Sequence, residues 1–314
     1  MHKKLQLNIS SLFGLLLLAL SVWAIANELR EYNYHDILRA IASIPLQSLS
    51  WAVEFTALGY LVMLGYDILG FAYLHRSLQW QKIALTNFIS SSFSNTIGFA
   101  LLTGSAIRYR FYSRWQVSKI AIAQIIAFVN FTFWLGMFTV AGLLFLIHPL
   151  VIPTQLHLPF TTARPLGWIF LSLIVIYLIS SLVIHRPLIF RTHEFRLPSF
   201  QISLMQIIIS SLDWIFAAAV LYSLLPINIP FNYLDFLGIY LLAMFAGVVS
   251  NVPGGLGVFE TVILLMLANK ISAAAVLAAM LAYRGVYYFL PLVFAIALLI
   301  IDEIKFGTQY LIKK

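Results

Sequence analysis

Five ionisable side chains lie inside apolar stretches of the chain, where they are the residues best placed to do chemistry. They are Glu54, Asp67, Asp213, Glu260 and Arg284. A charge near the centre of a bilayer costs several kcal/mol, so such residues are functional candidates by default. Arg108 and Arg110 follow a polar stretch of the chain and could face the same cavity as these five residues. Alternatively, some of these charges are fixed structural partners, for example Arg284 with Glu260 or with an aspartate.

The apolar region 234–268 is interrupted by the motif Asn251-Val252-Pro253-Gly254-Gly255-Leu256-Gly257-Val258-Phe259-Glu260. Proline lacks an amide hydrogen and each glycine costs backbone entropy, so an α-helix does not continue through this motif. In a bilayer, broken backbone is tolerated only where it is buried in protein or lines a wet cavity. The motif therefore predicts two half-helices that meet at a site, with free amides and the Glu260 carboxylate near the second half-helix.

Arg284 gives this site a chemical preference. A guanidinium stays charged at physiological pH and holds a phosphate with two parallel hydrogen bonds. The amides around Gly254, Gly255 and Gly257 favour an anion as well. Together they suit an anionic headgroup such as a phosphodiester, and Glu260 could contact an amine of that headgroup or take and release a proton. The neighbouring Tyr283, Tyr287 and Tyr288 could line a cavity, but an interfacial aromatic belt is the favoured interpretation.

Composition places these residues in an integral membrane protein. Of 314 residues, 62% are hydrophobic and 10% are charged, and several apolar runs exceed the roughly 20 residues needed to cross a bilayer. One all-α membrane domain over residues 1–314 accounts for the length and leaves no room for a soluble catalytic domain. There is no cysteine, and neither the histidines nor any other motif predicts a metal or cofactor. The basic residues lie in short loops, which argues for topology rather than nucleic-acid binding.

About six to eight transmembrane helices are expected. The predicted spans are 9–26, 49–74, 120–147, 167–184, 202–225 and 272–301. The first could instead be a secretory signal peptide, but a helix is favoured. The last contains Arg284 and Pro291 and is either one long kinked span or two shorter elements.

A second broken segment, about 83–103, has a polar centre from Ser90 to Gly98. Its Ser94-Asn95 can be aligned with Ser250-Asn251, and each broken segment follows a span with an internal aspartate. Three full spans separate the segments if each is a re-entrant hairpin, which places them on opposite sides of the membrane. This pattern predicts an inverted repeat. With the N-terminus inside, fourteen Lys and Arg residues are cytoplasmic and four are outside, so both termini are predicted to be cytoplasmic.

Three motifs resemble the membrane domain of bacterial lysylphosphatidylglycerol synthase/flippase proteins, and most closely its stand-alone, YbhN-like inner-membrane branch. They are Asn251-x-Pro253-Gly254-Gly255-x-Gly257-x-x-Glu260, Arg108-Tyr109-Arg110-x-Tyr112-Ser113-Arg114, and Ala282-Tyr283-Arg284 with Tyr287-Tyr288. The resemblance implies a bacterial inner-membrane protein related to proteins that move lipids between leaflets. Two-domain relatives also have a soluble domain that transfers an aminoacyl group. The resemblance covers the membrane domain, so it does not imply this transferase activity for the present chain.

The sequence therefore predicts a non-enzymatic lipid flippase or lipid transporter whose partners are membrane lipids. The candidate substrate-binding residues are Asn251, Pro253, Gly254, Gly255, Gly257, Glu260, Arg284, Arg108, Asp67 and Asp213. Two alternatives stay open: a transporter of a small soluble anion or amino acid, and a scaffold that delivers lipid to a partner. The lipid, the energy source and any homo-oligomer stay open as well.

Overall fold

The structure of the chain is a computed structural model that describes residue 39 and residues 42–97, 100–152, 161–184, 188–190, 193–227, 229–250, 257–268 and 270–312. The predicted first span and the motif residues Asn251, Pro253, Gly254 and Gly255 lie outside these ranges. The predictions made for them therefore stay predictions.

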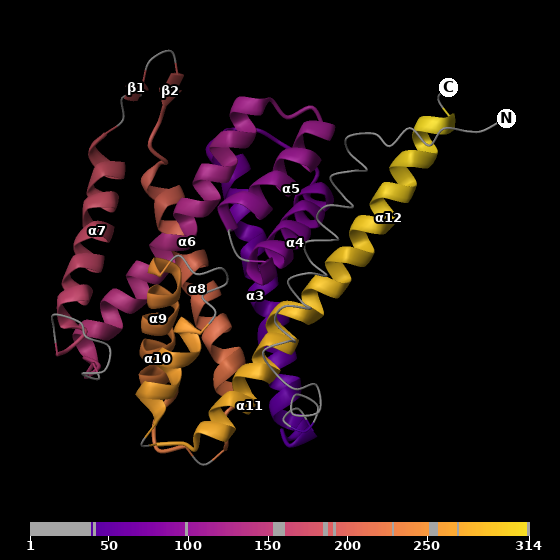
Figure 1. The fold of residues 1–314 in the computed structure, drawn as a ribbon. Helices are drawn as coiled ribbons and strands as arrows, with labels where there is room; N and C mark the ends of the chain where they lie inside the picture. Colours follow the sequence, from indigo (N-terminus) through magenta and orange to yellow (C-terminus); the bar gives the residue numbers. More distant parts are fainter. Residues whose placement is uncertain are drawn as a thin grey trace.

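Long apolar helices cross the molecule where the sequence predicts spans (Figure 1). They are α3 (Leu46–Tyr73), α6 (Lys119–Ile147), α7 (Arg164–Val183), α8 (Phe200–Leu224) and the continuous stretch Ala273–Lys305. Several begin at a serine whose hydroxyl accepts a backbone N–H of the first turn: Ser118 for α6, Ser199 for α8 and Ser272 for the stretch that begins at Ala273. Such caps satisfy one of the amides left open at a helix start. Together these helices define an integral membrane protein.

The last stretch is one continuous span rather than two elements. It consists of α11 (Ala273–Tyr283), a six-residue π-helix η3 (Arg284–Phe289) and α12 (Leu290–Ile312). The Leu290 amide donates to the Gly285 carbonyl, five residues back, which is the wider turn of a π-helix. The π-helix begins at Arg284, the intramembrane cation.

Both broken segments fold back as hairpins of short helices. The first pairs α4 (Trp80–Ile97) with α5 (Ala100–Arg114), and the second pairs α9 (Tyr233–Val249) with α10 (Val258–Leu267). Figure 1 shows them at opposite ends of the molecule, the first in the upper half and the second in the lower half. Three long helices, α6 to α8, lie between them in the chain, as the sequence predicts.

The contacts between helices occur in the same order in two units of the chain, as expected for an inverted repeat. In the first unit α3 packs on α4 and α6, α4 on α5, and α5 on α6; in the second α8 packs on α9 and α11, α9 on α10, and α10 on α11. The units meet along α3 and α8. Gly59 of α3 lies against Phe216 of α8, and Gly65 lies against Ile209, so the two helices run antiparallel. Inverted repeats of this kind are typical of secondary transporters.

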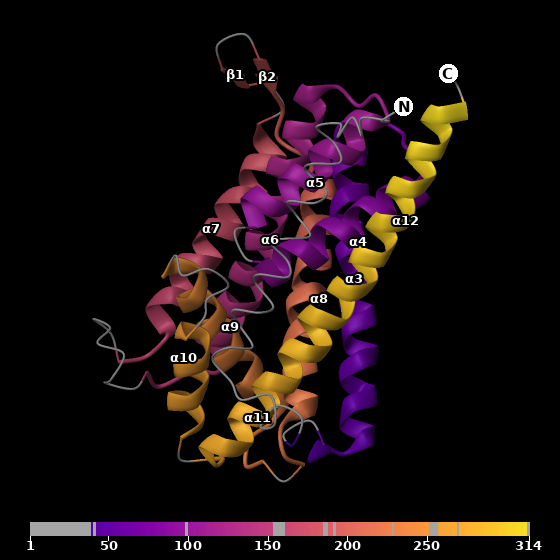
Figure 2. The same ribbon diagram turned by 45° about the vertical axis from the view of Figure 1, so that its right-hand side comes forward.

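The remaining elements complete the surface. Helix α7 connects the two units and exposes Trp168, Ile176 and Val183, as a lipid-facing helix would. Helix α12 runs beside α4 (Figures 1 and 2). Between α7 and α8, strands β1 (Leu188–Phe190) and β2 (His193–Phe195) form a small antiparallel hairpin, with Leu188 opposite Phe195. This hairpin is a minor addition to an otherwise helical fold.

Close approach of α6 and α8 depends on Gly136, because a β-carbon there would collide with the backbone of Ser210. Gly136→Ala is therefore expected to push the two helices apart and to lower the free energy of unfolding by about 1–3 kcal/mol. Gly238→Ala is the matched control, since its β-carbon would meet Leu150 at an ordinary 3.4 Å. Thermal unfolding in detergent measures both. Equal midpoints for the two variants would contradict the close contact.

Candidate functional site

Glu260 and Arg284 form an ion pair between α10 and η3. Helix α10 starts after Gly257, whose φ of +76° favours glycine. Glu260 is the third residue of α10, and its Oε2 accepts the Gly257 amide at 2.8 Å while its Oε1 pairs with Arg284 Nη2. The carboxylate thus caps the half-helix and holds the cation. Both side chains are mostly buried, with 8% of Glu260 and 15% of Arg284 exposed.

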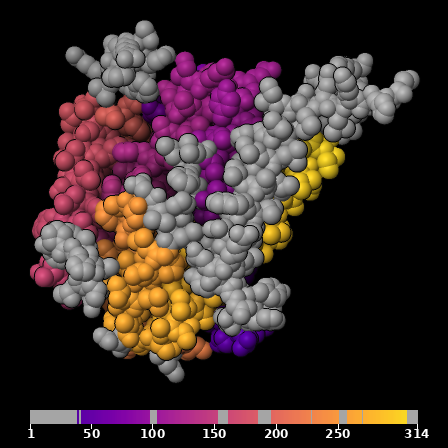
Figure 3. All heavy atoms as spheres, in the orientation of Figure 1, coloured from indigo at the N-terminus to yellow at the C-terminus, as the bar shows by residue number. Residues whose placement is uncertain are grey.

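The first unit also contacts this site. The Tyr60 hydroxyl of α3 donates to the Tyr287 carbonyl of η3 at 3.4 Å, and Thr96 Oγ1 of α4 donates to the Tyr288 carbonyl at 3.2 Å. Pro291 has no amide to donate to the Tyr287 carbonyl, four residues back, so the Tyr60 hydroxyl supplies a donor that the helix itself lacks. Arg284 therefore lies at the junction of the two units. In Figure 3 the second hairpin and α11 form the lower part of the visible face, below α5 and α6.

Tyrosines of α11 and η3 surround this junction. Tyr283 stacks on Tyr287 with ring centroids 5.2 Å apart, meets Tyr288 edge-on, and shares a 2.8 Å hydroxyl–hydroxyl hydrogen bond with Tyr240. Tyr283 and Tyr287 are 1% and 5% exposed. The preferred interpretation of these two residues as an interfacial belt is therefore wrong, because they pack inside the protein. They flank Arg284 on the inward-facing side of α11 and η3, which explains the burial.

Two glycines beside the ion pair are loosely surrounded. Within the described part of the chain, a β-carbon on Gly285 would meet no heavy atom within 4 Å, and the same holds for Gly257. Gly285 follows Arg284 in the chain, and Gly257 donates its amide to the Glu260 carboxylate. A guanidinium can hold an anion with two parallel hydrogen bonds, so Arg284 is the group of this site best suited to bind one.

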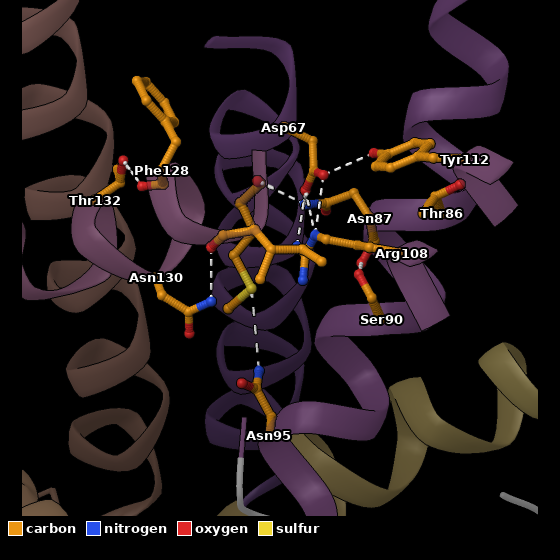
Figure 4. Close-up of polar contacts among 12 residues, drawn as sticks. Asp67, Thr86, Asn87, Ser90, Asn95, Arg108, Tyr112, Phe128, Asn130 and Thr132 are labelled. Atoms are coloured by element: carbon orange, nitrogen blue, oxygen red, sulfur yellow. Dashed lines mark hydrogen bonds and ion pairs between the residues drawn. The ribbon is translucent and has the colours of Figure 1, made fainter. Parts of the chain in front are cut away.

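Asp67 and Arg108 form a second buried ion pair, in the first unit (Figure 4). Arg108 contacts the carboxylate through Nε at 3.0 Å and Nη2 at 2.8 Å. The Tyr112 hydroxyl and the Asn87 amide add donors, each at 2.7 Å. The participants come from α3, α4 and α5, so this pair fixes the first hairpin onto α3. The structure thus joins Arg108 to Asp67, and Arg284 to Glu260, as two distinct pairs.

Asp213 and Glu54 complete the intramembrane candidates. Asp213 of α8 accepts a 2.7 Å hydrogen bond from the Tyr66 hydroxyl on Oδ2, and its Oδ1 is buried without a hydrogen-bond partner in the described part of the chain. Glu54 is exposed on the outer side of α3, so it belongs to neither pair.

Sequence reasoning missed the supporting side chains. Asn87 lies just before the polar run 90–98, Tyr112 lies inside the basic motif 108–114, and Tyr66 immediately precedes Asp67. Their positions in the sequence were a signal, but their pairing depends on how α3, α4, α5 and α8 pack.

The basic run that ends α5 is paired with the end of α12. Arg110 contacts Glu303 at 2.5 Å, and Arg114 contacts Glu303 at 2.9 Å and also pairs with Asp302. These acidic partners offset part of the positive charge, which makes this run less suited to docking an acidic partner.

The five candidate spans of the described residues, the two opposed hairpins and the internal ion pairs define a multi-pass membrane protein. Residues 9–295 match the lysylphosphatidylglycerol synthase TM region, and the chain belongs to that family. It is 44% identical to an uncharacterized protein of Synechocystis sp. over 92% of this chain and 90% of that protein. It is 32% identical to the inner membrane protein YbhN of Escherichia coli over 85% and 84% of the two chains.

A more distant relative is phosphatidylglycerol lysyltransferase of Staphylococcus xylosus, which is 24% identical over 91% of this chain. The match covers only 33% of that enzyme. The shared part is therefore the membrane region alone.

Proposed function

We propose that this protein is a lipid transporter of the bacterial inner membrane that moves a lipid with an anionic, phosphate-bearing headgroup between the leaflets. The observation that carries the proposal is the Glu260–Arg284 pair, largely buried at the junction of two inverted units. Inverted-repeat transporters bind their substrates at such junctions, near broken helices.

Arg284 is placed to exchange one anionic partner, the Glu260 carboxylate, for another, the phosphate of a headgroup. Glu260 keeps a second partner, the Gly257 amide, so it remains hydrogen-bonded when the guanidinium turns away. Arg284 can then hold a phosphate with two parallel hydrogen bonds while the acyl chains stay in the bilayer. The headgroup thus replaces Glu260 as the counter-ion of Arg284, and the charge never becomes isolated in the protein interior.

The relatives support a phospholipid rather than a soluble solute. The family includes phosphatidylglycerol lysyltransferases, whose name states an action on phosphatidylglycerol, and their membrane region is the part matched here. We propose a non-enzymatic role for this chain. We also propose that the C-terminal ends of α5 and α12 and both chain termini lie on the cytoplasmic side. The inner-membrane location of the YbhN relative supports the membrane assignment.

Lipids that co-purify in mild detergent test this function. Mass spectrometry of the wild type is expected to reveal one enriched anionic phospholipid class, which Arg284→Ala loses. Lys270→Ala is the matched control, because it removes one positive charge from a loop of the same unit, where Lys270 lies over the Phe231 ring. Lipid profiles that match the bulk membrane in all three proteins would contradict a lipid site and favour a soluble anion or a scaffold role.

A further inference from the structure

Asp213 is a buried carboxylate without the compensation that the other buried aspartate has. The Asp67 carboxylate receives a guanidinium, an amide and a hydroxyl. Asp213 is only 5% exposed, yet it receives the Tyr66 hydroxyl alone, and its Oδ1 has no hydrogen-bond partner in the described part of the chain. Burying an ionised carboxylate in this way is costly, and a proton on Oδ1 would remove the charge.

The groups that face Asp213 offer no counter-charge. They are hydroxyls within electrostatic reach of the carboxylate: Tyr66 and Tyr60 from α3, Tyr240 from α9 and Tyr287 from η3. Helices α6, α7 and α11 also pack against α8, but no described Lys, Arg or His side chain on any element pairs with Asp213. A metal ion would need about six oxygen ligands, more than this site supplies, whereas a proton needs only one oxygen and no cavity.

The position of Asp213 links it to movement of the two units. The carboxylate comes from α8 of the second unit and the Tyr66 hydroxyl from α3 of the first, so their hydrogen bond crosses the seam between units. Alternating access moves one unit against the other at such a seam. Opening the seam would admit water to Asp213 and allow the carboxyl group to ionise; closing it would favour the protonated form.

We infer that Asp213 is a proton-binding site that couples lipid movement to a proton gradient, an inference whose coupling part rests on the proposed function. The proton is held on the buried carboxyl group while the seam is closed and leaves to water when the seam opens. Glu260 is less suited to this role, because both of its oxygens already hold donors, Arg284 and the Gly257 amide.

Infrared spectroscopy of the protein in a detergent without ester or carboxyl groups tests proton binding without any transport. At neutral pH the wild type is expected to show a protonated-carboxyl C=O band that shifts in D₂O. Asp213→Asn, a near-isosteric change, abolishes this band. Tyr66→Phe retains the band at a shifted frequency, because it removes only the hydrogen bond to the carboxyl group. Asp235→Asn is the matched control and leaves the band unchanged, since Asp235 lies in the first turn of α9. A band that persists in Asp213→Asn, or its absence from the wild type, overturns the inference.

A transport measurement then tests coupling separately. An imposed proton gradient is expected to accelerate lipid movement by the wild type and to have no effect on Asp213→Asn. If a gradient drives both proteins equally, the coupling fails while lipid transport stands. If neither protein moves lipid, the proposed function fails, and the infrared result still decides whether Asp213 binds a proton.

Discussion

Glu260→Gln is expected to abolish lipid movement in reconstituted liposomes while the protein stays folded and inserted. Glutamine keeps an oxygen that can accept the Gly257 amide, so the cap of α10 survives. It removes the negative charge that holds Arg284 in place, and the guanidinium then lacks the counter-ion that the headgroup is proposed to replace. We expect transport to fall at least ~100-fold, equivalent to about 2.7 kcal/mol. A fluorescent phospholipid with a quencher on one side of the bilayer measures the rate.

Thr261→Val is the control for this experiment. Thr261 is the next residue of α10 and is exposed, and within the described residues its hydroxyl bonds to the Gly257 carbonyl of its own turn. Its replacement is expected to leave the rate within about twofold of the wild type, because a local hydroxyl–carbonyl bond on a surface contributes little. Equal rates for Glu260→Gln and Thr261→Val would contradict a role of the ion pair in transport.

The spans and hairpins were predictable because the bilayer imposes them. Long apolar runs must form helices, and the Gly-Pro cluster near Gly257 must break one, so composition alone located α6, α8 and the second hairpin. The odd number of intervening spans then placed the two hairpins on opposite sides. None of these steps required knowledge of side-chain packing.

The identities of the charged candidates were predictable, but their partners were not. Arg284 and Glu260 stand out as charges in apolar sequence, and their pairing was one alternative among several. Asp67 could equally have paired with Arg284; the structure assigns it to Arg108 because the first hairpin folds back against α3. Such partners depend on tilt and register between helices, which the periodicity of one helix does not encode.

The π-helix was also beyond sequence reasoning. Pro291 suggested a kink in the last stretch, and it has no amide to donate to the Tyr287 carbonyl four residues back. The sequence did not show that the irregular turn is a π-helix that begins at Arg284. Outside hydroxyls from Tyr60 and Thr96 bond to its carbonyls, so tertiary contacts from the other unit favour this geometry. π-helical turns often occur at functional sites, which agrees with the position of Arg284.

Arg108→Met is expected to cause the largest loss of stability among substitutions in the first unit. It leaves the fully buried Asp67 carboxylate with only Asn87 and Tyr112 as donors and without a counter-charge. Breaking a buried ion pair from one side typically costs about 3–5 kcal/mol, because the remaining charge is still desolvated. Unfolding in mixed micelles with increasing denaturing detergent measures the change.

A double variant separates the ion pair from simple packing. Asp67→Asn combined with Arg108→Met removes both charges, and the asparagine oxygen can still accept from Tyr112, so most of the lost stability is expected to return. Arg76→Met is the control; Arg76 is exposed beyond α3, and its replacement is expected to change stability by less than about 0.5 kcal/mol. If the double variant is as unstable as Arg108→Met, the arginine acts through its packed volume, and the charge of Asp67 is not what holds the first hairpin against α3.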